Sequence, residues 1–71
     1  MTFGKYIKNS RETLATSSKG YSLRKVAFAI EVEPSFLSKV ERDLVSPPSE
    51  AKIVALAGQL GEDPDILLAM A

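Results

Sequence analysis

The sequence predicts an all-α domain of five short helices, and three observations support this prediction. Apolar residues recur at spacings of three and four, prolines and glycines separate the segments that show this spacing, and no segment alternates in the manner of a strand. The chain has 71 residues, of which 45% are apolar, and this suits one globular domain with a single modest core. Residues 1–71 are therefore expected to form one domain.

A first helix is predicted to begin after Thr2, a residue type that caps helix N-termini, and to run to about Ala15. Ile7 and Leu14 are spaced along one side of this helix, as expected where a helix packs on a core. The next residues, 16–20, are rich in serine and glycine and therefore predict a loop.

Segment 22–43 carries the most informative pattern, which is that of two short amphipathic helices joined by a tight turn. Val26 and Ile30 share one face of the first of these helices, and the small side chain of Ala27 lets the two helices cross closely. A steep crossing leaves the outer face of the second helix free to enter a DNA major groove. The pattern is therefore that of a helix-turn-helix.

The boundaries of these two helices are marked by residue types that favour helix starts. Ser22 is a good N-cap for the first of them. The second helix is predicted to start near Pro34, where the missing N–H costs nothing, and to end close to Asp43. Leu37 and Val40 then face inward.

Two further helices are predicted in the remainder of the chain. Consecutive prolines make segment 44–48 a loop. Ser49 can cap a fourth helix that ends at Gly61, and Asp63 can cap a fifth helix with Pro64 at its first position. The predicted core consists of Ile7, Val26, Ala27, Ile30, Val32, Leu37, Val40, Ile53, Leu56, Leu60 and Ile66.

The net charge of zero conceals two halves of opposite sign. Residues 1–42 carry eight lysines and arginines against four glutamates, whereas residues 43–71 carry one lysine against five acidic residues. Attraction to phosphate depends on the local surface rather than on the total charge, so the first half can dock on a duplex.

Several classes of protein are disfavoured by the composition. The chain has no cysteine or histidine, so we expect neither an enzyme nor a metal or cofactor site. The acidic residues Glu62, Asp63 and Asp65 are explained by their place at a helix start. The longest apolar run, 66–71, is too short to span a bilayer, and Lys5 and Lys8 are not followed by the apolar region of a signal peptide. A cytoplasmic protein is therefore expected.

At the residues described above, the chain resembles the lambda-repressor-like, or XRE-type, helix-turn-helix family. The resemblance extends over the whole chain: a first helix with Ile7 and Arg11, the segment 35–42, and a final run, 47–68, that looks like the fourth and fifth helices of the family. It implies a five-helix lambda-repressor-like domain that binds double-stranded DNA and regulates transcription. We expect a repressor that occupies a palindromic operator as a dimer.

The family pattern, carried over residue by residue, implies DNA contacts around the start of the third helix. Base contacts would come from Pro34, Ser35, Phe36 and Lys39. Lys39 can donate to guanine, and Phe36 can pack on a thymine methyl group. We expect Phe36 to face outward, since other residues fill the inner positions of the helix. The phosphate contacts implied by the pattern fall to Ser22, Ser38, Arg42 and Ser46.

The same resemblance singles out five structural positions. Arg11 and Glu41 match residues that form an ion pair between the first helix and the end of the recognition helix. Glu31 and Asp43 stand where the family usually has glycine, and a positive φ at Glu31 would cost about 1 kcal/mol. Leu23 replaces a glutamine that binds phosphate in many phage repressors, so that contact is not expected here.

Two surfaces for protein partners are also predicted. Leu68, Met70 and Ala71 have no obvious place in so small a core, and a symmetric contact between two fifth helices would cover them. Phe28 falls on the outer face of the second helix, where Tyr21 and the preceding loop cover it or a partner binds it. Two alternative functions are therefore open: a protein-interaction module that has kept the fold, and an antitoxin or restriction-modification controller.

Overall fold

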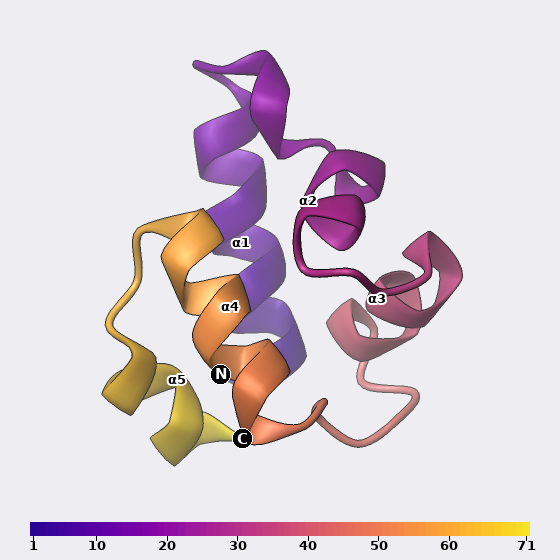
Figure 1. Ribbon diagram of the computed structural model, residues 1–71. Coiled ribbons are helices and arrows are strands. Elements are labelled where there is room, and N and C mark those ends of the chain that lie inside the picture. The colour runs from indigo at the N-terminus through magenta and orange to yellow at the C-terminus, as the bar shows by residue number, and fades with distance from the viewer.

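The structure of the protein is a computed structural model that describes all 71 residues and contains helices but no strands (Figure 1). The all-α prediction is therefore confirmed. None of the helices combines the length and apolar character needed to cross a bilayer. In chain order the elements are α1 (Phe3–Ala15), a short 3₁₀ turn η1 (Lys19–Tyr21), α2 (Leu23–Ala29), α3 (Pro34–Glu41), α4 (Glu50–Leu60) and α5 (Pro64–Met70).

Helix α1 runs through the centre of the domain (Figure 1). It contacts α3 on one side and α4 on another, while α2 packs on α3 and α5 packs on α4. The helix-turn-helix formed by α2 and α3 therefore lies apart from α5, at the opposite side of the domain (Figure 1).

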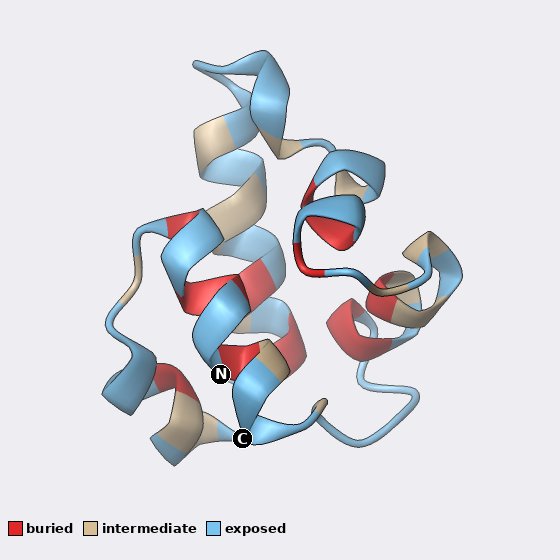
Figure 2. Cartoon of the chain, in the orientation of Figure 1, coloured by how far each residue is buried: buried red, intermediate tan, exposed pale blue.

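All five α-helices contribute to one apolar core, and the buried segments in Figure 2 line the space between them. Most of the core residues expected from the sequence are buried. Helix α1 also contributes Phe3, which the prediction did not include. The core consists of Phe3, Ile7, Val26, Ala27, Ile30, Leu37, Val40, Ile53, Leu56, Ala57, Leu60 and Leu67.

The core prediction is wrong at two positions. Val32 is only partly buried, because it lies in the turn and packs against the edge of the core. Ile66 is 49% exposed, whereas Leu67 is fully buried. The consecutive apolar residues of α5 do not by themselves reveal which of them faces inward, and it is Leu67 that is buried where α5 packs on α4.

Four helices begin at the capping residues that the sequence predicts. The side chains of Thr2 and Ser22 each accept a hydrogen bond at 3.2 Å from the backbone N–H three residues later. Ser49 does the same at 3.4 Å, and Asp63 accepts from the N–H two residues later at 2.9 Å. Each cap satisfies a backbone donor that the first turn leaves free.

Three helices are followed by a residue whose backbone has a left-handed conformation, with positive φ. Gly61 follows α4 with φ 67°, as expected for a glycine at this place, whereas Glu31 follows α2 with φ 60° and Asp43 follows α3 with φ 58°. Helix α3 ends at Glu41, two residues before Asp43 and close to the predicted end. Residues other than glycine rarely adopt this backbone conformation, so the surrounding structure must stabilise it at Glu31 and Asp43.

The start of α1 lies directly against the end of α3. A Cβ atom on Gly4 would collide with the carbonyl oxygen of Val40, so only glycine fits at this contact. Thr2 Oγ1 donates to Asp43 Oδ2 at 2.6 Å, and the Gly4 N–H donates to Asp43 Oδ1 at 3.2 Å. The left-handed Asp43 therefore helps to cap α1 and joins it to α3.

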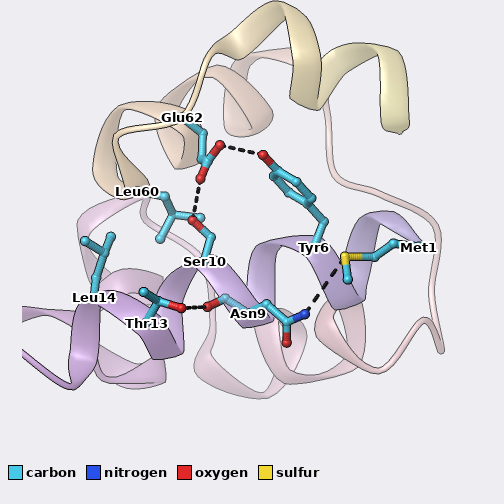
Figure 3. Close-up of a pocket in the computed structure, with 8 residues that line it drawn as sticks. All are labelled: Met1, Tyr6, Asn9, Ser10, Thr13, Leu14, Leu60 and Glu62. Atoms are coloured by element: carbon cyan, nitrogen blue, oxygen red, sulfur yellow. Dashed lines mark hydrogen bonds between the residues drawn. The ribbon is translucent and has the colours of Figure 1, made fainter.

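A second polar contact joins α1 to the segment between α4 and α5. Glu62 accepts hydrogen bonds from Tyr6 Oη and Ser10 Oγ, each at 2.7 Å (Figure 3). The three side chains line an open pocket of about 410 Å³. The hydrogen bonds from Ser10 and Tyr6 lower the pKa of Glu62, and the bond to the carboxylate raises the pKa of Tyr6. Glu62 is therefore a charged link between the two halves of the chain.

We predict that adjacent residues of α5 differ sharply in their contribution to stability. Leu67→Ala should cost about 2 to 5 kcal/mol, because it leaves a cavity beneath α4. Ile66→Ala serves as the matched control and should cost about 0.5 kcal/mol or less, because Ile66 is 49% exposed. Urea unfolding of both variants provides the measurement, and equal losses would show that the orientation of α5 is wrong.

We also predict that the Glu62 link weakens in acid. The folded-state pKa of Glu62 is lowered, so its contribution is complete above the unfolded pKa, near 4.5, and is lost as the pH falls through the lower folded value. The difference in Tm between the wild type and Glu62→Gln should therefore be largest near neutral pH and should shrink in acid. Glu33→Gln is the control, because Glu33 makes no capping hydrogen bond. A difference that does not change with pH would contradict the role of the carboxylate.

Candidate nucleic-acid interface

Helix α3 has one buried side and one exposed side. Leu37 and Val40 are each 1% exposed and face the core, in agreement with the prediction. Ser35 and Lys39, one helical turn apart, are exposed, and neither side chain makes a hydrogen bond or ion pair within the chain. These two polar side chains are therefore available to an external ligand.

Three other predicted contact residues on α3 are less accessible. Pro34 stands at the first position of the helix and is partly buried, as is Ser38. Phe36 is also partly buried and packs against the core. The expectation that Phe36 faces outward is wrong in this respect, because Phe36 is partly covered by the core that Leu37 and Val40 enter.

The remaining predicted phosphate contacts lie outside α3. Ser22 is exposed at the start of α2, where its hydroxyl accepts from the Lys25 N–H at 3.2 Å. Arg42 is exposed just after α3, and its Nε donates weakly to the Ser38 carbonyl at 3.4 Å. Ser46 is exposed in the following loop. The structure thus distributes these candidates over the start of α2, helix α3 and the loop after it.

The position of α3 is fixed by an ion pair with α1. Arg11 Nε and Nη2 donate to the two oxygens of Glu41 at 2.7 and 3.0 Å, and the side chains are 11% and 4% exposed. Arg11 Nη1 also donates to the Tyr21 carbonyl at 3.2 Å. The hydrogen bonds to Glu41 raise the pKa of Arg11, so the guanidinium remains charged at all ordinary pH values.

Charge is distributed unevenly over the fold. The eight lysines and arginines of residues 1–42 lie in the part built from α1, η1, α2 and α3. Of these, only Arg11 forms an ion pair within the chain. The acidic residues of the second half lie mainly at the starts of α4 and α5. The part of the domain that carries α3 is therefore the basic part.

Other predicted surfaces also have clear positions. Leu68 and Met70 are partly buried against the core, so the expectation that they have no place in it is wrong, while Ala71 is exposed. Phe28 on α2 is 61% exposed, and Tyr21 does not cover it. No group of three or more acidic side chains is arranged to hold a metal ion.

Two structural contacts around the helix-turn-helix were not predicted. The Lys52 ammonium donates to the Ile30 carbonyl at 2.8 Å, and Asp43 accepts from Thr2 and Gly4. The sequence does contain signals for them, because Lys52 is the only cation in the acidic half and Asp43 stands at a position that requires φ > 0. Neither signal reveals the partner, which is distant in the chain.

Comparison with known protein families identifies one match. The helix-turn-helix family model matches residues 6–67, which include all the positions that build the α2–α3 motif. No curated protein and no solved structure matches the chain.

We predict that the interaction between Arg11 and Glu41 adds to the free energy of unfolding beyond the separate contributions of the two side chains. Glu41→Gln should cost about 3 kcal/mol, because it leaves the partly buried Arg11 guanidinium without its counter-charge. Replacing both residues, as Arg11→Met with Glu41→Leu, should recover most of this loss. Urea unfolding of Arg11→Met, Glu41→Leu and the double variant completes the cycle, and strictly additive losses would show that the two side chains do not interact.

Proposed function

The chain belongs to the XRE-type, lambda-repressor-like helix-turn-helix family of DNA-binding regulators, and we propose that it is a sequence-specific repressor that binds double-stranded DNA. The observation that carries this proposal is the outer side of α3. Ser35 and Lys39 are exposed and unpartnered on a helix whose other side is fixed in the core. A rigid helix with free polar groups is suited to read base edges in a major groove.

The proposed base contacts come from the start of α3. Lys39 donates to guanine O6 and N7, and Ser35 hydrogen-bonds a base edge or a phosphate. Pro34 and the accessible part of Phe36 make apolar contacts, of which a thymine methyl group is the natural partner of the ring. This assignment gives Lys39 the main role in sequence preference.

The proposed phosphate contacts surround this base-reading face. Arg42 and Ser46 follow α3, Ser22 begins α2, and Ser38 lies on α3 itself. Contacts of this kind fix the register of the protein on the duplex and add affinity that falls with salt. The basic character of residues 1–42 supports their role despite the neutral total.

We further propose that two copies bind a near-palindromic operator. The domain extends at most 27 Å, which is less than the roughly 34 Å between half-sites one helical turn apart, so one copy reaches one half-site. The proposed contact lies at the end of α5 and uses the exposed Ala71, the accessible parts of Leu68 and Met70, and the 49% exposed Ile66. Light scattering of the DNA complex should give two chains per operator, and a stoichiometry of one at saturating protein would exclude this dimer.

A second candidate function is supported by Phe28. Its 61% exposure leaves a large aromatic surface uncovered, which suits a protein-interaction module that has kept the fold and lost DNA binding. A heparin or DNA column separates the two functions. Retention with elution by salt supports DNA binding, whereas passage without retention supports a pure protein-interaction module.

We predict that Lys39 and Arg42 contribute differently to DNA binding, Lys39 through a base and Arg42 through a phosphate. Lys39→Ala should weaken binding to a duplex selected by the wild type from a random pool by about 1 to 3 kcal/mol and should relax preference at one base pair. Arg42→Ala is the matched variant and should weaken selected and random duplexes alike, because a phosphate contact carries no sequence information. Equal losses on both duplexes for Lys39→Ala would show that Lys39 is a phosphate contact.

A further inference from the structure

A lysine from α4 binds the turn between α2 and α3. Lys52 Nζ donates to the Ile30 carbonyl at 2.8 Å and to the Glu31 carbonyl at 3.4 Å. We propose that Lys52 is a positioning residue that locks the turn of the helix-turn-helix and thereby holds α3 in the orientation that reads DNA. This inference rests on the proposed function, although its structural part can be tested without DNA.

The two carbonyls are among those at the end of α2 that lack a backbone partner. The Val32 N–H bonds the Ala27 carbonyl at 2.9 Å, and the Glu31 N–H bonds the Phe28 carbonyl at 3.1 Å. The carbonyls of Ala29, Ile30 and Glu31 accept no backbone hydrogen bond, and Lys52 binds the last two of them. They lie at the negative end of the helix, where an ammonium group is the most favourable donor.

The position of the ammonium group explains how glutamate is tolerated in the turn. Glu31 has φ 60°, a conformation that disfavours a residue with a Cβ. The Ile30 carbonyl belongs to the peptide group before Glu31 and the Glu31 carbonyl to the peptide group after it. Lys52 therefore binds both peptide groups that flank the strained residue and restrains the backbone on each side of it.

Lys52 also connects the turn to the core. The next residue along α4, Ile53, is 3% exposed, so the backbone that carries the lysine is firmly packed. Lys52 itself is partly buried and forms no ion pair. Because its ammonium group is engaged by the turn, Lys52 acts on DNA binding through α3 rather than through a phosphate.

The test uses four variants of the full chain, one control variant and two duplexes. Lys52→Met keeps the length of the side chain and removes the charge, while Lys52→Arg keeps a donor. Glu31→Gly removes the need for restraint, and it is studied alone and combined with Lys52→Met. Lys19→Met is the control, because Lys19 is exposed and has no hydrogen-bond partner. The duplexes are one selected by the wild type from a random pool and one of scrambled sequence.

Lys52→Met should lower Tm by about 4 to 8 °C, as expected for loss of a charge-assisted hydrogen bond, and should speed amide exchange at Glu31 and Val32. At a temperature where all variants are folded, it should weaken the selected duplex by about threefold to tenfold with no change in salt dependence. Lys52→Arg should restore most of each loss, and Lys19→Met should change neither Tm nor amide exchange at the turn. In the Glu31→Gly background, Lys52→Met should have a much smaller effect.

Three results would overturn the proposal. A salt slope reduced by about 0.9 would make Lys52 a phosphate contact. An equal loss of Tm on Lys52→Met with glutamate and with glycine at position 31 would show that the lysine does not stabilise the strained turn. Unchanged amide hydrogen exchange at Val32 in Lys52→Met would show the same. If the wild type binds neither duplex, the proposed function fails, while the exchange and Tm measurements still decide whether Lys52 restrains the turn.

Discussion

The position of α3 depends on the ion pair between Arg11 and Glu41. It is bidentate, with N–O distances of 2.7 and 3.0 Å, and it connects the central helix α1 to the end of α3 in a largely buried setting. Burying such a pair costs desolvation free energy, which offsets part of the attraction between the charges. The pair therefore contributes to the orientation of α3 as much as to stability. Next to it, Gly4 allows the backbone of α1 to approach that of α3 closely, and Asp43 bonds the first turn of α1. One end of α3 is thereby fixed relative to the core.

Two strained residues lie on either side of α3, and each is stabilised by a contact from a distant part of the chain. Glu31 precedes the helix with φ 60°, and Lys52 binds the carbonyls around it. Asp43 follows the helix with φ 58°, and its carboxylate accepts from Thr2 and Gly4. Glycine would avoid the strain at both places but could not supply the carboxylate at position 43. The chain therefore accepts local strain where it gains tertiary contacts that orient α3.

The sequence predicts the fold well because its signals are local. Caps such as Ser22 and Asp63, the prolines and the three- and four-residue spacing define every helix within a few residues. It predicts side-chain direction less well where apolar residues are adjacent, as at Ile66 and Leu67, since either of them can face inward. The hydrogen bonds of Lys52 were not predictable, because they join positions more than twenty residues apart and depend on how α4 packs beside the turn.

The central claim is that the domain presents the outer side of α3, supported by the basic half of the chain, to double-stranded DNA. Amide chemical-shift mapping by NMR during titration with a duplex selected from a random pool tests it most directly. The account predicts the largest changes at Ser35 and Lys39, with further changes near Ser22, Arg42 and Ser46. Binding that leaves these amides unchanged and shifts those around Phe28 instead would contradict the account and would identify α2 as the functional surface.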